Sequence, residues 1–515
     1  MKRFVNGAFK IIFSRMLIIF LMVVLQVLVL LASFLWLGRY LHYIWEGMSL
    51  LGAILIIYIV NRDEPAEFKI SWIIPICVFP VLGALIYVFV ISNVGGIGLK
   101  AKIYRRMKET EGLLATSEET AEVLKECPKY YQGFSHYMEH RAGYPAYHNS
   151  EAVYYPLGEN KFEDLLRELK KARHYIFLEY FIVERGIMWD AVLEILKEKV
   201  KEGVEVRVMY DGMCSIVLLP YSYPKQLQKY GIKAKMFAPI IPFLSTSQNN
   251  RDHRKILVID GKVAFTGGVN LADEYINQKK LYGHWKDIAV KVTGDAVRSF
   301  TVMFLQMWNV SEKGKEDYEK YLQGIEYDCP LYHDGFVIPY GGTPTLKEEV
   351  TQTVYKSMID NAVQYVHIMT PYFIVDREFL DSMRYAAQRG VEVVMILPHI
   401  PDKRIVYDIA RTFYPSLLRA GIKVYEYTPG FIHAKAFVSD DISAAVGSVN
   451  LDYRSFYHHF ECGVHFFDNK VVGKVEEDFQ ATLKKCQEVT WEYYRKIPLF
   501  KKLLGRIFKL FAPMM

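Results

Sequence analysis

The chain carries two copies of a short motif in which histidine, lysine, aspartate and asparagine recur at the same spacing. The first copy comprises His253, Lys255, Asp260 and Asn270, and the second comprises His433, Lys435, Asp440 and Asn450. In both copies the lysine follows the histidine by 2 residues, the aspartate by 7 and the asparagine by 17. A histidine that only completes a hydrogen bond in a core does not need these three companions, so the pair indicates chemistry.

This set of side chains suits reactions at a phosphodiester, whose negative charge repels oxyanion nucleophiles. Two lysines and two asparagines can hold the non-bridging oxygens and stabilise the charge of the transition state. A neutral imidazole can attack phosphorus to form a phosphohistidine, while a protonated one can give a proton to the leaving oxygen. The sequence offers no aspartate cluster that would hold a metal, so we expect neither a metal nor another cofactor.

Strand geometry predicts how each motif is positioned. The residues between Lys255 and Asp260 are apolar, as in a buried strand. With a side-chain period of two, the histidine and the lysine lie on one face and the aspartate falls on the other. This odd spacing favours a structural role for Asp260 and Asp440 at the strand end. The glycines that follow predict a turn into a second strand, which brings the asparagine back beside the histidine.

An internal repeat supplies the elements that carry the two motifs. From about residue 150 to 490, strand-like apolar runs alternate with helical ones, as in an α/β domain. The block Tyr175–Val183 reappears as Val366–Val375, and the spacing between copies drifts along the chain, as expected for one unit repeated with different loops. We therefore predict two pseudo-symmetric α/β units, 146–325 and 326–492, that share one active site.

On these motifs and the segments around them, the chain resembles the phospholipase D superfamily, and within it the bacterial cardiolipin synthases. The segments are Asn250–Lys255, Phe265–Tyr275, His284–Asp287, Gly430–Lys435, Gly447–Phe456, Phe460–Glu461 and, in a hydrophobic stretch, Ser71–Tyr87. The resemblance implies two phospholipase D-like α/β units preceded by N-terminal transmembrane helices. It also implies that two phosphatidylglycerol molecules are converted into cardiolipin and glycerol through a phosphohistidine.

The resemblance gives each motif residue a role. It makes His253 the nucleophile and His433 the general acid and base, although the reverse assignment stays open. It includes Asp260 and Asp440 in the catalytic motif, against the structural role that their spacing favours. The residues that would bind the substrate phosphate are Lys255, Lys435, Asn270, Asn450 and Ser448, which stands opposite Gly268 of the other half.

Two carboxylates, Asp287 and Glu461, look like the groups that orient the two histidines. Beside them the chain departs from the family pattern at two places. His459, next to His458, stands where relatives usually have an asparagine before Phe-Glu, and Lys286 stands where they often have arginine. Neither change removes a catalytic group. Both leave the head-group preference open, including whether phosphatidylethanolamine can serve as a donor.

Long uncharged stretches predict membrane spans near the N-terminus. Met16–Gly38 contains 23 uncharged residues and 70–99 contains 30, and roughly 20 apolar residues cross a bilayer as a helix. Gly47–Asn61 has only 15 and is marginal, so we expect two or three spans. Residues 1–15 and 100–108 carry lysine and arginine without acids. This bias predicts a multi-pass protein of the cell membrane with its catalytic part on the cytoplasmic side.

The net charge also indicates a membrane partner. The total is +6, but residues 1–15, 100–108 and 495–515 contribute +4, +5 and +6, which leaves −9 for the rest. The excess therefore lies beside the hydrophobic segments and in the tail, and we expect contact with anionic lipid, not nucleic acid. The remaining predicted parts are a membrane anchor at 1–95, a juxtamembrane linker at 96–145 and a basic amphipathic tail at 493–515.

Composition excludes some classes, and the motifs leave alternatives. A chain that is 51% hydrophobic and 23% charged is not globally disordered, and its six cysteines show no CxxC spacing typical of a zinc ribbon. The alternatives to a cardiolipin synthase are a phospholipase D-type hydrolase, a nuclease or a synthase of a different phospholipid. A non-catalytic lipid-binding scaffold fits less well, because both motifs are intact. The oligomeric state stays open.

Overall fold

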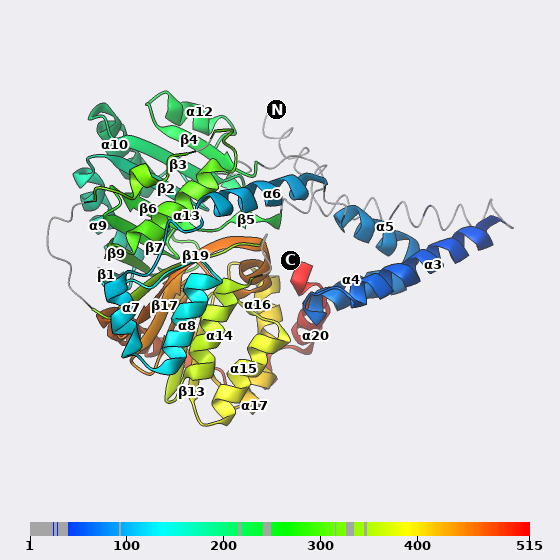
Figure 1. Ribbon diagram of the computed structural model, residues 1–515. Helices are drawn as coiled ribbons and strands as arrows, with labels where there is room; N and C mark the ends of the chain where they lie inside the picture. The colour runs from blue at the N-terminus through cyan, green and yellow to red at the C-terminus, as the bar shows by residue number, and fades with distance from the viewer. Residues whose placement is uncertain are drawn as a thin grey trace. The chain divides into compact units, whose positions relative to one another are not determined.

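The computed structural model describes residues 24, 28, 40–91, 94–214, 218–239, 249–314, 316–325, 334–344 and 348–514. The chain divides into two compact units (Figure 1). The larger unit comprises residues 98–240 and 249–509, and the smaller comprises 1–97, 241–248 and 510–515. Both motifs lie in the larger unit.

The larger unit contains two mixed sheets of the same design. The first has seven strands in the order β1-β9-β7-β6-β2-β3-β4. Their bounds are Ser150–Tyr155 (β1), Tyr175–Tyr180 (β2), Glu205–Asp211 (β3), Lys233–Phe237 (β4), Lys255–Ile259 (β6), Val263–Gly267 (β7) and Ala289–Gly294 (β9). Strands β2, β3 and β4 run parallel, while the other neighbours are antiparallel.

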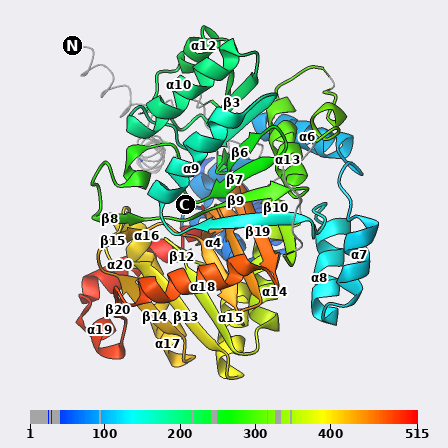
Figure 2. The ribbon, with the colours of Figure 1, turned by 90° about the vertical axis from the view of Figure 1, so that its left-hand side faces the viewer.

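The second sheet repeats this order as β10-β19-β17-β16-β11-β13-β14 and adds β20 at its end. The bounds are Phe336–Gly342 (β10), Tyr365–Met369 (β11), Glu392–Pro398 (β13), Lys423–Tyr427 (β14), Ala436–Ser439 (β16), Ser443–Gly447 (β17), His459–Phe467 (β19) and Cys486–Glu488 (β20). Here β11, β13 and β14 are the parallel strands. Each strand of the first sheet has a counterpart at the same place in the second, which confirms the predicted pair of α/β units. Figure 2 shows β3, β6, β7 and β9 of the first sheet in green, and β13 and β19 of the second in yellow and orange.

Helices cover the sheets and connect the parallel strands. Helix α10 follows β2, and α15 follows β11 and the short strand β12 (Phe373–Ile374). Each helix has a fully buried aromatic side chain, Trp189 in α10 and Phe379 in α15. The helices are Gly158–Lys171 (α9), Ile187–Lys201 (α10), Tyr223–Gln228 (α12), Val297–Asn309 (α13), Val350–Asn361 (α14), Arg377–Gln388 (α15), Arg404–Arg411 (α16), Tyr414–Arg419 (α17), Lys470–Leu483 (α18), Trp491–Lys496 (α19) and Leu499–Lys509 (α20). Buried strands and packed helices together give the motifs a rigid frame.

The region predicted as a juxtamembrane linker, 96–145, is largely helical. It contains most of α6 (Val94–Glu109), together with α7 (Glu118–Lys125) and α8 (Lys129–His140). In α8 the Tyr131 ring stacks on that of Phe467 in β19, with 3.6 Å between the ring centroids. Helix α8 is therefore part of the core of the second half.

In the smaller unit, the uncharged stretch 70–99 does not form one helix. It contains α4 (Ala66–Val78, in part) and α5 (Pro80–Ile91), which are separated at Phe79. Pro80 lacks a backbone N–H and disfavours helical backbone in the residue before it, so the chain turns there. A side chain at Gly83 would clash with the backbone of Pro75, so this glycine lets the two helices pack closely.

The marginal run Gly47–Asn61 lies in α3 (Tyr40–Val60) except for its last residue. Over the stretches for which the structure gives positions, none of the helices combines the length and the apolar character needed to cross a bilayer. The first predicted span, Met16–Gly38, lies outside the described residues apart from Val24 and Leu28.

Candidate active site

Short strands exchanged between the two halves build the site. In the first half, β5 (Arg251–Asp252) leads into His253, and it pairs with the start of β19, which leads into Glu461. In the second half, β15 (Gly430–Ile432) leads into His433, and it pairs with β8 (His284–Lys286), which leads into Asp287. Each histidine therefore meets a carboxylate that the other half supplies.

Backbone hydrogen bonds fix these exchanged pairs. The amide of His253 donates to the carbonyl of Phe460 at 2.9 Å, and the amide of His433 donates to the carbonyl of Lys286 at 2.7 Å. The two contacts are equivalent in the repeat. The pseudo-symmetry that the sequence predicts for the sheets thus extends to the residues that carry the chemistry.

His253 is held by Glu461. Its Nδ1 lies 2.9 Å from both carboxylate oxygens. The same carboxylate, which is fully buried, accepts hydrogen bonds from the hydroxyls of Ser448 and Ser455, the latter at 2.8 Å. Three donors therefore share the single negative charge of Glu461.

His433 is held by Asp287 in a simpler arrangement. Its Nδ1 lies 2.6 Å from Oδ2, and Oδ1 accepts from the backbone amide of Ile288 at 2.8 Å. Gly268 faces this carboxylate, and a Cβ at that position would clash with it. The glycine is therefore required for Asp287 to reach its place.

These carboxylate contacts decide which imidazole nitrogen can react. A carboxylate only accepts hydrogen bonds, so the Nδ1 of each neutral histidine carries the proton. The lone pair then lies on Nε2, the nitrogen available to a substrate. The arrangement orients both His253 and His433 for nucleophilic or acid–base chemistry through that atom.

The electrostatics of the site favour an anion. Burial, reinforced by Lys255 and Lys435, lowers the pKa of His253 well below its usual value. Burial and Lys435 lower the pKa of His433 to about 4, although Asp287 opposes them. Burial also lowers the pKa of Lys255 to about 8 and that of Lys435 to about 7. A bound phosphate would offset the electrostatic repulsion between these buried cationic groups.

The motif lysines are buried beside their own histidines. Lys255 Nζ donates to the His253 carbonyl at 2.6 Å, and Lys435 Nζ donates to the His433 carbonyl. Each ammonium group has three N–H donors, and one of them is used in this way. The remaining donors can bind phosphate oxygens.

The two motif asparagines differ. The Asn270 amide donates to the Tyr275 hydroxyl at 2.7 Å and accepts from the Ile182 amide at 3.0 Å. The buried Oδ1 of Asn450, in contrast, has no hydrogen-bond partner among the described residues. Asn270 is thus already engaged with the protein on both sides of its carboxamide.

Two predicted roles change with the structure. The Ser448 hydroxyl, expected to bind phosphate, donates its one proton to Glu461, with the Cys462 carbonyl 3.1 Å away, so it positions the carboxylate. The motif aspartates lie at the far ends of their strands. Asp260 accepts from three consecutive backbone amides, Arg173 to Tyr175, and Asp440 accepts from Val363 to Tyr365. These backbone contacts favour a structural role, as the odd spacing indicates, and the assignment of the two aspartates to catalysis stays a prediction.

Sequence reasoning did not place His459 in the site, although it noted the departure. The His459 ring lies beside that of His253, with 5.4 Å between the centroids. It is 8% exposed. His459 and Glu461 are two residues apart on one strand and so share a face. This two-residue spacing was the feature of the sequence that could have placed His459 in the site.

Comparisons with known proteins identify the family of this chain. A family model described as "Cardiolipin synthase, PLD-like domain" matches residues 165–308 and 355–483, more than half of the chain. A cardiolipin synthase of Alkalihalophilus pseudofirmus is 33% identical over 471 residues, which cover 90% of this chain and 91% of that protein. The chain belongs to the cardiolipin synthase family of the phospholipase D superfamily. A second model, "Phospholipase_D-nuclease N-terminal", matches residues 50–90.

Other relatives extend the comparison. An uncharacterized protein of Streptococcus mutans is 45% identical over 460 residues, which cover 89% of this chain and 99% of that protein. Among solved structures, phosphatidylserine synthase of Haemophilus influenzae has a TM-score of 0.54 at 16% identity, covering 71% of this chain and 93% of that chain. At this identity the likeness concerns the fold.

Proposed function

We propose that this chain is a cardiolipin synthase that transfers a phosphatidyl group from one phosphatidylglycerol to another and releases glycerol. The observation that carries the proposal is the exchanged pair of histidine–carboxylate contacts in a buried, cationic site. Membership of the cardiolipin synthase family supports the choice of substrate. The reaction needs a nucleophile, an acid that becomes a base, and groups that hold a phosphodiester.

In the first step, His253 Nε2 attacks the phosphorus of the donor lipid. A P–N bond forms while the bond between phosphorus and the glycerol head-group oxygen breaks. His433 gives its Nε2 proton to that oxygen, so glycerol leaves neutral. Lys255 and Lys435 hold the non-bridging oxygens as charge develops on them.

In the second step, the acceptor is the head-group hydroxyl of a second phosphatidylglycerol. Now neutral, His433 takes the proton of this hydroxyl, whose oxygen attacks phosphorus as the P–N bond breaks. Cardiolipin forms, and both histidines return to their starting states. If water took the place of the acceptor, the product would be phosphatidic acid and the enzyme a hydrolase.

The different carboxylate environments support His253 as the nucleophile. Because two serine hydroxyls share the charge of Glu461, this carboxylate attracts a proton to His253 only weakly. Asp287 makes its short contact with His433 without such competition from hydroxyls, so it stabilises a protonated imidazole better. A neutral nucleophile and a protonated acid are the states that the first step requires.

The protonation of His433 depends on the substrate. With the site empty, the pKa of His433 is about 4, so it is neutral at pH 7. A phosphodiester placed between the lysines adds a negative charge nearby, and this raises the pKa of His433. The acid is therefore charged when the anionic substrate is bound.

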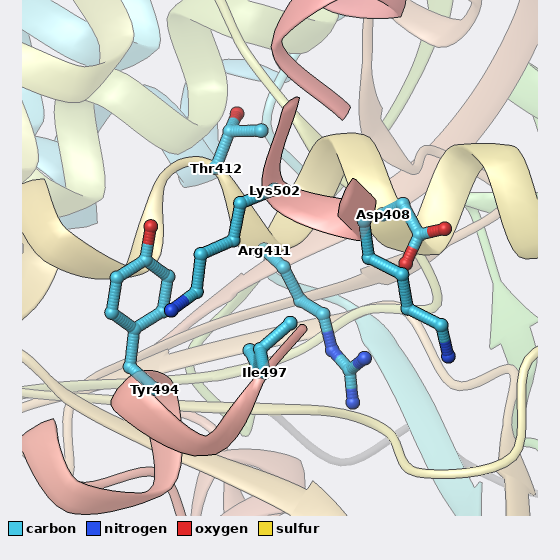
Figure 3. Close-up of a pocket in the computed structure, with 7 residues that line it drawn as sticks. Asp408, Arg411, Thr412, Tyr494, Ile497 and Lys502 are labelled. Carbon is cyan, nitrogen blue, oxygen red and sulfur yellow. The ribbon is translucent and has the colours of Figure 1, made fainter. Parts of the chain in front are cut away.

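The C-terminal helix supports a membrane-surface location. In α20, Leu499 and Phe500 are 80% and 71% exposed, next to Lys501 and Lys502. Figure 3 shows Lys502 and Arg411 lining a pocket beside this helix. We infer that α20 lies on anionic lipid, with apolar side chains in the interface and cations at the phosphates.

The uncharged N-terminal stretches support an integral anchor, with the basic flanks on the cytoplasmic side. We accordingly place the catalytic unit on the cytoplasmic face of the cell membrane, with phosphatidylglycerol and anionic lipid as its partners. Protease accessibility of sites inserted at the flanks of Gly47–Asn61, in sealed vesicles, tests this topology.

The test of the reaction uses the purified full chain in detergent micelles with phosphatidylglycerol labelled in its glycerol head group and its phosphate. We expect release of glycerol and formation of cardiolipin. Samples quenched with detergent in alkali, where a P–N bond survives, should carry labelled phosphate on His253 and not on His433. Phosphatidic acid as the only product would contradict the transferase, and label on His433 alone would reverse the assignment of the two histidines.

A further inference from the structure

We propose that the site also binds a zinc-type divalent cation through His253, His459 and Glu461, and that this ion inhibits the enzyme. These three residues each offer one ligand atom, and the three atoms lie within 4.8 Å of one another. All three residues are buried. The inhibitory part of this proposal rests on the proposed function, in which His253 is the nucleophile.

His459 is the residue that points to a ligand. Neither of its ring nitrogens has a hydrogen-bond partner among the described residues, although the side chain is more than nine-tenths buried. A buried polar group without a partner costs stability unless something else occupies the space beside it. Its Nδ1 lies 3.7 Å from Glu461 Oε1, too far for a hydrogen bond but suitable for two atoms that share an ion.

The donor set selects the kind of ion. Two imidazoles and one carboxylate are ligands that zinc prefers, whereas magnesium and calcium prefer sets made of oxygen alone. Zinc–ligand bonds of about 2.0 Å would bring tetrahedral ligand atoms to about 3.3 Å from one another. The three atoms would have to move closer together to bind the ion, and the His459 ring would break no hydrogen bond in doing so. A fourth position remains for water.

Binding of the ion would remove the nucleophile. If zinc occupies Nε2 of His253, the lone pair that attacks phosphorus is taken directly. If it occupies Nδ1, the proton of the neutral ring moves to Nε2, and the lone pair is lost as well. In either case Glu461 is drawn from its role as the partner of His253.

The other half of the site has no equivalent. His459 precedes its carboxylate, Glu461, by two residues, and the residue two before Asp287 is Trp285. The Trp285 ring lies 5.4 Å from that of His433, the same separation as between His459 and His253. Indole N–H is a donor only and cannot ligate a cation. The ion should therefore act on the nucleophile and not on the general acid.

The experiment compares the full-length wild-type chain with His459→Asn and His140→Asn in micelles. His140 is a matched control because its ring stacks on that of His136, at 4.1 Å on the exposed side of α8, where a surface pair of histidines can also bind zinc. Each protein is titrated with zinc chloride, and phosphatidylglycerol turnover is expressed relative to its own metal-free rate. Separately, each is titrated with Co²⁺, whose visible absorption reports tetrahedral coordination.

We expect zinc to inhibit wild type and His140→Asn equally, with full recovery after a chelator is added. The zinc concentration for half inhibition should rise at least about tenfold in His459→Asn, since a direct ligand is lost. The tetrahedral cobalt spectrum should persist in His140→Asn and weaken by a similar factor in His459→Asn.

Two results would overturn the proposal. Equal zinc sensitivity of His459→Asn and wild type would exclude His459 as a ligand of an inhibitory ion. A cobalt spectrum that depends on His459, without any effect of zinc on turnover, would exclude inhibition. The cobalt titration does not need substrate. It therefore still tests the metal site if the proposed phosphatidyl transfer itself proves wrong.

Discussion

The two halves of the larger unit share one strand order but surround their histidines differently. In one half His253 contacts Glu461, whose charge is shared with two serine hydroxyls and which lies beside His459. In the other, His433 contacts Asp287, which has a backbone amide as its further partner and Trp285 nearby. A duplicated fold thus presents two similar imidazoles in unequal settings, as the proposed division into a nucleophile and an acid requires.

The residue that faces each carboxylate is part of this difference. Ser448 donates its hydroxyl to Glu461. Its counterpart Gly268 has no side chain and leaves space for Asp287. The Glu461 side chain is therefore stabilised by a serine hydroxyl, whereas the shorter Asp287 side chain fits because Gly268 has no Cβ. Substitutions that exchange these features should affect the two halves unequally.

The largest expected difference is between Asp287→Asn and Glu461→Gln. In Asp287→Asn, the amide of Ile288 must still find an acceptor, so the new carboxamide oxygen faces it and the NH₂ group faces His433. This forces the His433 proton onto Nε2 and leaves Nδ1 unprotonated. The neutral ring is then a poor acid in the first step, and it has no Nε2 lone pair to act as the base in the second. We expect kcat to fall by about 10⁴-fold.

In Glu461→Gln, the hydroxyls of Ser448 and Ser455 can rotate to accept from the NH₂ group, so the oxygen can still face His253. We expect a loss of only about 10²-fold in kcat. Both variants are assayed with the same labelled phosphatidylglycerol, and circular dichroism checks that they are folded. Equal losses in the two variants would show that the serines do not distinguish the two carboxylates.

A smaller difference is expected between Gly268→Ala and Ser448→Ala. The new methyl group in Gly268→Ala would displace Asp287 and misalign His433, which should lower kcat by about 10²-fold. Ser448→Ala removes one donor from Glu461, but the contacts with Ser455 and His253 remain, and we expect a loss of about tenfold or less. Single-turnover kinetics measures both steps. A greater loss in Ser448→Ala would contradict this order.

The repeat was readable from the sequence because each histidine is followed by the same companions at the same spacing. The spacing of Asp260 correctly indicated a strand end, since a strand alternates its faces. The exchange of β5 and β8 between the halves was not predictable, because these strands are two and three residues long and pair with partners more than 140 residues away. Contacts of this kind arise from the packing of two folded halves.

The contact of Ser448 with Glu461 was not predictable for a related reason. A serine opposite a glycine in a repeat reads as an added phosphate ligand, but the direction of its hydroxyl depends on where Glu461 lies in three dimensions. The turn at Phe79 was signalled by Pro80, yet the length of the uncharged stretch outweighed that signal. At Phe79 the local rule for proline described the turn, whereas at Ser448 no local rule gives the direction of the hydroxyl.

A proton balance sharpens the assignment of His433. Its pKa of about 4 in the empty site rises when an anion binds, so at pH 7 binding should take up protons from the solution. Lys435, with a pKa of about 7, contributes to the same uptake. The share of His433 is up to about one proton at pH 7. It should fall to about half a proton near pH 4, where the free histidine is half protonated, and vanish well below that pH.

Calorimetry in two buffers of different ionisation enthalpy, with a non-hydrolysable phosphonate analogue of phosphatidylglycerol, measures this uptake. His433→Gln should retain only the part that the lysines contribute. Uptake that is identical in wild type and His433→Gln would show that His433 does not gain a proton on binding, and the general acid would have to be sought elsewhere.

The smallest effect on activity is expected for Asp260→Asn, although the residue belongs to the motif. Asparagine tolerates the left-handed backbone of this position, where φ is 53°, so the substitution changes the charge and one acceptor but not the turn. Three backbone amides lose part of their acceptor, which should reduce the free energy of unfolding by about 1–3 kcal/mol. Because Asp260 contacts backbone and neither imidazole, kcat below the melting temperature should stay within about twofold of wild type. Thermal unfolding and kcat are measured on the same preparation, with Asp440→Asn as the equivalent in the other half. A loss of kcat without a loss of stability in either variant would show that the motif aspartates take part in catalysis. Their position at the strand ends would then not separate them from the active site.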